Sequence, residues 1–241
     1  MDRCGRKRRI FGHTALESRL MPLHPPTALA CALLLLASHI APATAASAVY
    51  QLDPVHTRVM VAVEHAGFSK AIGTVSGSSG RIEFDPADWS TATVQVSVPL
   101  DKLDFGDPKW NAAVQAGNLL DGEHFATAEF RSTRVEAIDA THATVHGDLS
   151  LRGVSREVKL DVTLNALKRH PLPPFRRTAG FSASTVLSRA DFGIDAWKSV
   201  IGDRIELRLE VEATRTRAGA ADDTEDSPPD LPDPTTEPTT P

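Results

Sequence analysis

The stretch VYQLDPVHTRVMVAVEHAGF (residues 49–68) contains the pattern that decides the fold class. Valine occupies alternate positions at Val59, Val61 and Val63, and the charged residues Arg58 and Glu64 fall on positions of the opposite parity. Successive side chains of a β-strand point to opposite faces of its sheet. This alternation therefore predicts a half-buried strand with the valines on its buried face.

Two histidines, His56 and His65, flank the valine row and raise the question of a metal or catalytic pair. A strand rises about 3.3 Å per residue, so the two rings would lie roughly 30 Å apart on opposite faces. His142 and His146 have the spacing of helical metal ligands. Their surroundings alternate like a strand, however, which puts them about 13 Å apart as solvated or edge residues. We therefore predict no metal site and no cofactor.

The same alternation recurs along the middle of the chain, interrupted by glycine, proline or aspartate. About eight half-buried antiparallel strands at such spacing predict an all-β barrel or sandwich. The further strand segments are residues 91–100, 141–153, 156–167, 180–192 and 204–213, with shorter candidates at 71–77, 80–85 and 128–137.

One segment, DPKWNAAVQAGNLLDG (residues 107–122), predicts a helix between strands. Asp107 can cap the first turn of this helix, and Pro108 suits its first position. One face of the helix would then present Trp110, Val114 and Leu120.

The inward rows are mostly valine and leucine, and aromatic residues make up only 5% of the chain. An eight-stranded closed sheet has room inside for filling side chains or for one small ligand. A smooth aliphatic lining suits a hydrocarbon chain, and it equally suits a plain packed core, so both remain open. GSSG (residues 77–80) has the features of a flexible turn and not of a nucleophile elbow. We find no catalytic residues.

Both ends of the chain differ from the middle. Residues 1–48 combine a basic start, the apolar run TALACALLLLA and small residues before a cut, which is typical of a secretory signal peptide. Cleavage patterns end at Ala45 and at Ala48. Residues 218–241 contain seven acids, no base and six prolines, which predicts a disordered acidic tail. We expect one exported, periplasmic domain over residues 49–217.

The two cysteines, Cys4 and Cys31, both fall within the predicted signal peptide. The mature domain would therefore have no disulfide, thiol nucleophile or cysteine metal ligand. Its acidic and basic residues are nearly balanced, so there is no basic footprint for nucleic acid.

Four segments together resemble the YceI-like family, the exported lipocalin-like proteins that bind polyisoprenoids. They are YQLDPVHTRVMVAVEHAGFS (50–69), GDLSLRGVSREVKL (147–160), SRADFGI (188–194) and VIGDRIELRLEVEA (200–213). The resemblance spans about residues 50 to 214. TVSGSSG (74–80) and the helical region depart from the family pattern, and the latter borders the cavity in family members.

The resemblance implies an eight-stranded antiparallel lipocalin-like barrel with one or two short helices, built around an apolar tunnel. It implies a periplasmic carrier, not an enzyme, whose partner is a polyisoprenoid, quinone or fatty-acid-like ligand. A transient contact with a membrane or membrane protein and a homodimer stay open. Two alternatives are an enzyme acting on an amphiphile and a cavity-free stress-response or structural domain.

Strand phase and the helix face together give the residues that we expect to line the cavity and bind the ligand. They are Val59, Val61, Val63, Trp110, Val114, Leu120, Phe130, Leu149, Leu151, Phe181 and Leu187. We expect Asp148, Arg189 and Asp191 to fix turns and strand ends and not to hold a polar headgroup.

Overall fold

The computed structural model of the chain describes residues 47–216. Its elements, with η marking a 3₁₀ helix, are β1 (Ala48–Leu52), β2 (Arg58–His65), β3 (Ser69–Val75), β4 (Ser79–Phe84), η1 (Trp89–Thr91), β5 (Thr93–Pro99), η2 (Leu100–Lys102), α1 (Pro108–Gln115), β6 (Thr127–Ala137), β7 (His142–Leu151), β8 (Val154–Arg169), β9 (Arg177–Ser188), η3 (Ala190–Phe192) and β10 (Ile201–Arg215).

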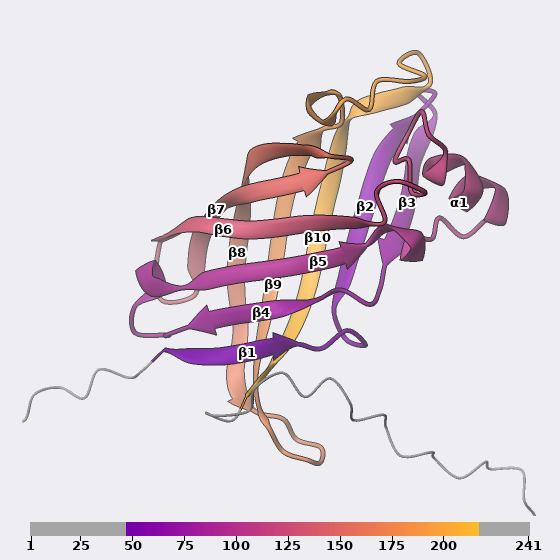
Figure 1. The fold of residues 1–241 in the computed structure, drawn as a ribbon. Coiled ribbons are helices and arrows are strands. Elements are labelled where there is room, and N and C mark those ends of the chain that lie inside the picture. Colours follow the sequence, from indigo (N-terminus) through magenta and orange to yellow (C-terminus); the bar gives the residue numbers. More distant parts are fainter. Residues whose placement is uncertain (1–46, 217–241) are drawn as a thin grey trace, which may run out of the picture. The chain divides into compact units, whose positions relative to one another are not determined.

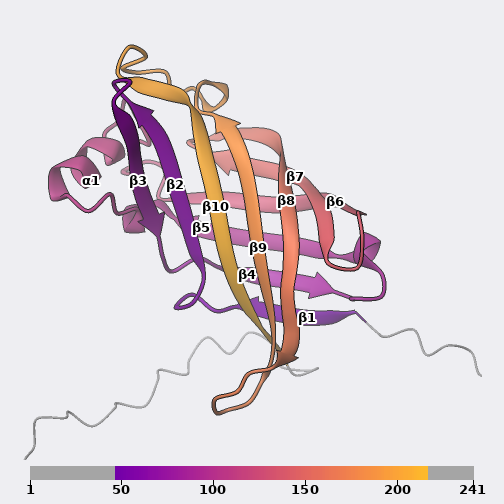
Figure 2. The ribbon, with the colours of Figure 1, turned by 180° about the vertical axis from the view of Figure 1, so that it is seen from behind.

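Eight of these strands close an antiparallel barrel (Figure 1). The order around it is β1-β4-β5-β6-β7-β8-β9-β10, and β10 pairs back onto β1. The strand β10 is long enough to pair with two partners along the same side. Its residues 201–210 pair with β2, and its residues 213–215 pair with β1. The hairpin β2–β3 thus extends the sheet beside the closed barrel (Figure 2). The predicted eight-stranded antiparallel barrel is confirmed.

The strands show the inward and outward alternation that their sequences predict. Along β9, Ala179, Phe181, Ala183 and Leu187 are buried, and Val186 points outward with 44% of its surface exposed. Along β3, Ala71, Gly73 and Val75 are buried, and the alternating positions Ile72 and Thr74 are exposed. One face of each strand therefore faces the interior of the barrel.

An aromatic cluster fills one part of the barrel interior. The ring of Phe84 makes edge-to-face contacts with Trp89 at 4.9 Å and with Phe181 at 5.6 Å between centroids. Aromatic pairs in this geometry contribute about 0.5–1.5 kcal/mol beyond their buried area. The buried residues Tyr50, Val135 and Val145 belong to the same cluster.

Two local predictions are corrected by the structure. The helix expected over residues 107–122 ends at Gln115, because Ala116 adopts an extended backbone with ψ 153°. Leu120 therefore follows the helix, although its backbone N–H still donates to the Val114 carbonyl at 3.0 Å. The pattern from Val55 to His65 also predicts one continuous strand, but β2 begins only at Arg58, and the exposed Val55 and His56 lie in the preceding turn.

The predicted acidic tail and almost all of the predicted signal peptide lie outside the described residues. Ala48 is described and belongs to β1, where it pairs with Phe84. Cleavage after Ala45 would leave this strand whole, whereas cleavage after Ala48 would remove its first residue.

Candidate ligand-binding cavity

The barrel encloses a cavity of about 770 Å³. This volume lies within the range of about 300–1,000 Å³ that is usual for small-molecule sites. Its wall includes the buried aromatic residues Phe84 and Trp89 as well as Trp110 and Trp197, which are partly exposed. The cavity therefore reaches from the aromatic cluster to the molecular surface.

All eleven residues expected to bind ligand lie on this wall, including Leu120 from outside the helix. The valine row of β2 faces the cavity beside an equivalent row of β10, and the sheet register pairs them as Val59↔Leu209, Val61↔Leu207 and Val63↔Ile205. Strand phase thus placed these side chains correctly. Their contact with a ligand stays a prediction.

Several wall residues were missed from the sequence. The inward row of β5, Val94, Val96 and Val98, lines the cavity, and its alternation could have identified it. Trp89 and Trp197 also line the wall, but they come from segments rich in turn residues, where periodicity carries no information.

The mouth of the cavity is built by three segments that meet around the end of β2. The rings of His65 and Trp110 lie 5.3 Å apart. The backbone N–H of Ala66 donates to the Val200 carbonyl, and the N–H of Val200 donates to the Trp197 carbonyl at 2.8 Å. Trp197 is 62% exposed and still lines the cavity. A tryptophan at such a boundary can contact both the ligand and the solvent.

Arg189 holds the loop that carries Trp197. Its buried guanidinium donates from Nε to the Gly202 carbonyl at 2.9 Å, from Nη1 to Ile194 at 2.8 Å and from Nη2 to Ile201 at 2.8 Å. These bonds confirm the expectation that Arg189 fixes a turn.

Asp203 holds the start of η3 in the same region. Its carboxylate accepts the backbone N–H of Ala190 at 3.0 Å. The hydrogen bond from Ser188, then this N–H and the charge of Arg189, lower the pKa of Asp203. A charged carboxylate is therefore maintained beside the loop.

Two buried polar atoms belong to wall residues and have no hydrogen-bond partner within the described chain. They are the hydroxyl of Ser78 and the indole N–H of Trp89. GSSG is thus not the flexible turn expected, since Ser78 is fully buried and β4 begins at Ser79. Leaving a buried polar group unpaired costs about 1–3 kcal/mol, so either atom could bond a polar group of a ligand.

The remaining chemistry of the wall is sparse. Its other polar or charged residues are Thr57, Glu64, His65, Asn118, Thr185 and Arg189. Among residues 47–216, no hydrogen bond joins the side chains of two wall residues. An activated nucleophile needs a base within hydrogen-bond reach. The wall is therefore suited to holding an apolar molecule.

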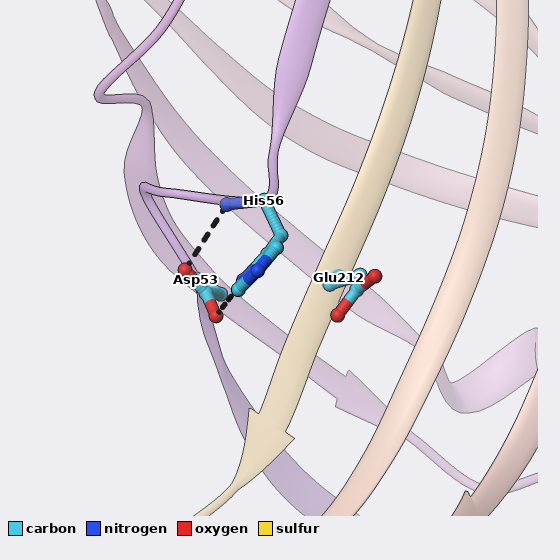
Figure 3. A group of neighbouring side chains, drawn as sticks. All are labelled: Asp53, His56 and Glu212. Atoms are coloured by element: carbon cyan, nitrogen blue, oxygen red, sulfur yellow. Dashed lines mark hydrogen bonds and ion pairs between the residues drawn. The ribbon is translucent and has the colours of Figure 1, made fainter. Parts of the chain in front are cut away.

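Outside the barrel, Asp53, His56 and Glu212 form a group with ligand atoms within 4.8 Å of one another (Figure 3). The Nδ1 atom of His56 lies 2.7 Å from Asp53 Oδ2, and Asp53 Oδ1 accepts the N–H groups of Val55 and His56. Burial alone would raise the pKa of Asp53, but these hydrogen bonds outweigh it and lower the pKa. The same carboxylate raises the pKa of His56.

Because Nδ1 of His56 donates to the Asp53 carboxylate, that nitrogen carries a proton and is not free to bind a metal ion. The turn is also tied to β10, where the backbone of Glu212 bonds the N–H of Asp53 at 2.8 Å and the hydroxyl of Thr57 at 3.3 Å. We interpret the group as a set of hydrogen bonds and charges that stabilises the turn between β1 and β2.

His146 corrects another expectation. It lies on β7 as predicted, but it is 2% exposed and not solvated. Its Nε2 lies 3.1 Å from a guanidinium nitrogen of Arg134 and 3.3 Å from the Glu136 carboxylate. Long side chains from the neighbouring strands therefore cover the ring.

Residues 50–213 match the family of the YceI-like domain. This chain belongs to the YceI-like family. The match confirms the resemblance seen in the four sequence segments.

Related proteins and solved structures resemble this chain over most of its length. A UPF0312 protein of Shewanella baltica is 29% identical over 181 residues, which is 74% of this chain and 94% of that protein. The crystal structure of Burkholderia cenocepacia BcnA is 21% identical with a TM-score of 0.61, covering 68% of this chain and 99% of BcnA. A polyisoprenoid binding domain from Saccharophagus degradans, implicated in plant cell wall breakdown, is 14% identical with a TM-score of 0.51. The match covers 69% of this chain and 98% of that domain. Both structures share the fold.

Among residues 47–216, no helix is both long and apolar enough to cross a bilayer.

Proposed function

We propose that this chain is a periplasmic carrier that holds a long-chain isoprenoid, a quinone tail or another amphiphilic lipid in the barrel cavity. The observation that carries the proposal is the cavity of about 770 Å³ with a wall of mainly aliphatic and aromatic side chains. The polyisoprenoid binding domain of Saccharophagus degradans supports it through a shared fold. The signal-peptide pattern of residues 1–48 supports export.

The hydrophobic effect alone can supply the affinity. Each buried methylene contributes about 0.8 kcal/mol, so about ten of them would supply roughly 8 kcal/mol. Before the costs of association, 8 kcal/mol corresponds to a dissociation constant near ~1 μM. No charged contact is needed for the hydrocarbon ligand to bind, and Ser78 and Trp89 can add hydrogen bonds to a polar group of that ligand.

We propose that the ligand enters the cavity through the mouth lined by Trp110 and Trp197. Transient contact with a membrane or membrane protein and pairing into a homodimer are further parts of the proposal. The chain acts as a binding protein and not as an enzyme, and it does not bind nucleic acid. A cavity-free structural role fits poorly with an interior of this volume.

Native mass spectrometry tests the proposal on full-length protein purified from the periplasm of its own host, followed by organic extraction. The expected result is a bound apolar molecule of defined mass in a large fraction of the protein. Fractionation of the same cells should recover the protein with periplasmic markers. A protein that emerges empty and fails to bind added geranylgeraniol or decylubiquinone would overturn the carrier function. Turnover of an added amphiphile would instead indicate an enzymatic function.

A further inference from the structure

The β8–β9 hairpin extends beyond the rest of the barrel (Figures 1 and 2). The pairing of β7 with β8 ends at Thr163, and the pairing of β10 with β9 ends at Thr178. β8 and β9 continue to pair with each other as far as Arg169↔Arg177. Among the described residues, the tip over 170–176 therefore has no strand beside it.

Four exposed cations flank this tip. They are Lys168, Arg169, Arg176 and Arg177. The sequence has no acidic residue between Asp161 and Asp191, although the whole chain has a formal net charge of −5. None of the four forms an ion pair within residues 47–216. The hairpin thus carries a local concentration of positive charge on a protein whose net charge is negative.

The same tip exposes two large apolar side chains. Leu172 is 64% exposed and Phe175 is 52% exposed. The N–H of Phe175 donates to the Leu172 carbonyl at 2.9 Å, and Phe175 has a φ of 56°. A bulky residue rarely adopts this left-handed conformation. The turn therefore holds both side chains in solvent at the end of the hairpin.

Exposed apolar residues between cations are typical of segments that bind at the surface of anionic membranes. The cations gain attraction from lipid phosphates, and the apolar side chains gain from entering the headgroup region. We infer that the β8–β9 hairpin docks this protein on an anionic lipid bilayer.

Docking through this hairpin has a consequence for orientation. The hairpin lies at the opposite end of the barrel from α1 and the β2–β3 turn (Figures 1 and 2). The end that contains α1 would then face the aqueous phase. The inference concerns a surface of the protein and does not depend on what occupies the cavity.

Cosedimentation with vesicles tests the inference on the full chain. The vesicles contain phosphatidylcholine alone or phosphatidylcholine mixed with phosphatidylglycerol, at low and high salt. We expect binding only to the mixed vesicles, weakened by salt. Each cation near an anionic surface contributes roughly a factor of five, so R176Q/R177Q should lower the partition constant about 30-fold. L172S/F175S should lower it about tenfold or more at either salt concentration.

The matched control is R204Q/R208Q, which removes the same charge from exposed positions of β10. It should bind the mixed vesicles like the parent, and so should the cavity variant A183F, which separates this inference from the proposed function. All these side chains except Ala183 are exposed, and unchanged thermal unfolding would confirm folding. Equal binding to both kinds of vesicle, or an equal loss in R204Q/R208Q, would overturn docking by the hairpin. If only a chain truncated after Thr216 binds, the acidic tail occupies the hairpin and docking of the intact protein is refuted.

Discussion

Filling the cavity from Ala183 should block ligand binding. Ala183 is buried on β9, lines the cavity, and pairs with Val162 of β8 and Leu209 of β10. Its replacement by phenylalanine places an aromatic ring in the cavity, next to the side chains of these two neighbours. The ring occupies the volume of about six ligand carbons, at about 0.8 kcal/mol for each buried methylene.

The loss of affinity follows from how far the ligand can shift. If all six carbons are displaced the loss is about 5 kcal/mol, and if the chain moves so that only two are displaced it is about 1.6 kcal/mol. We therefore expect A183F to weaken binding between about 15-fold and about 3,000-fold. The control V186F places the same ring on the outer face of the same strand, where Val186 is exposed, and should bind normally.

The chain provides its own optical probe for this titration. It contains three tryptophans, and Trp89, Trp110 and Trp197 all line the cavity. Decylubiquinone should quench their fluorescence as it binds, and geranylgeraniol should reverse the quenching by competition. Parent-like binding by A183F would refute the assignment of this cavity as the ligand site.

The same variant separates a real cavity from a packed core. Overpacking a filled core destabilises a protein by about 1–3 kcal/mol, whereas a ring added to an empty cavity has room and gains apolar contacts. Urea unfolding of ligand-free A183F should therefore give a free energy at least equal to that of the parent. A loss of about 1–3 kcal/mol with unchanged quenching would favour the cavity-free alternative.

Three further predictions concern stability, each measured by urea unfolding followed by circular dichroism. G80A should lose about 2–4 kcal/mol, because Gly80 has a φ of 145° and a Cβ there would collide with the β5 backbone. The control G180A meets no atom within 4 Å and should lose much less. R189K keeps the charge but loses the three-way hydrogen bonding, so we expect a loss of about 2–4 kcal/mol, and a loss below 1 kcal/mol would contradict the role of Arg189. His56 has a raised pKa beside Asp53, so its contribution is complete below its unfolded pKa near 6.5 and is lost as the pH rises through the folded value. After solvent screening this amounts to about half a kcal/mol or less, and H56Q should therefore match the parent at pH 9 and be slightly less stable at pH 5.5.

The inner wall of the barrel could be predicted from the sequence because strand periodicity is a local signal. Alternation in one strand fixes which side chains share a face, without any knowledge of its neighbours. That is why Val61 on β2 and Leu187 on β9 were placed correctly. Leu120 reached the wall for a different reason, since the chain turns back after Gln115 and its N–H bonds the Val114 carbonyl.

The errors concern residues whose surroundings come from distant segments. His146 is buried because Arg134 and Glu157 reach over it from the two neighbouring strands, which no pattern within its own strand can indicate. Trp89 lies in a turn-like stretch and becomes buried through its contact with Phe84, whose ring also contacts Phe181. His56 precedes its strand because the Asp53 carboxylate accepts the backbone N–H groups of Val55 and His56 and so holds the turn.

The cavity itself follows from where the large side chains lie. An eight-stranded barrel is just wide enough inside for side chains to fill it. Here the rings of Phe84, Trp89 and Phe181 gather at one place, and much of the remaining wall consists of valine and of small residues such as Ala71 and Ala183. These short side chains cannot meet across the barrel, so space is left between the aromatic cluster and the mouth. A bound hydrocarbon chain would then complete the core, and it would raise the free energy of unfolding by an amount set by the ratio of free ligand concentration to the dissociation constant.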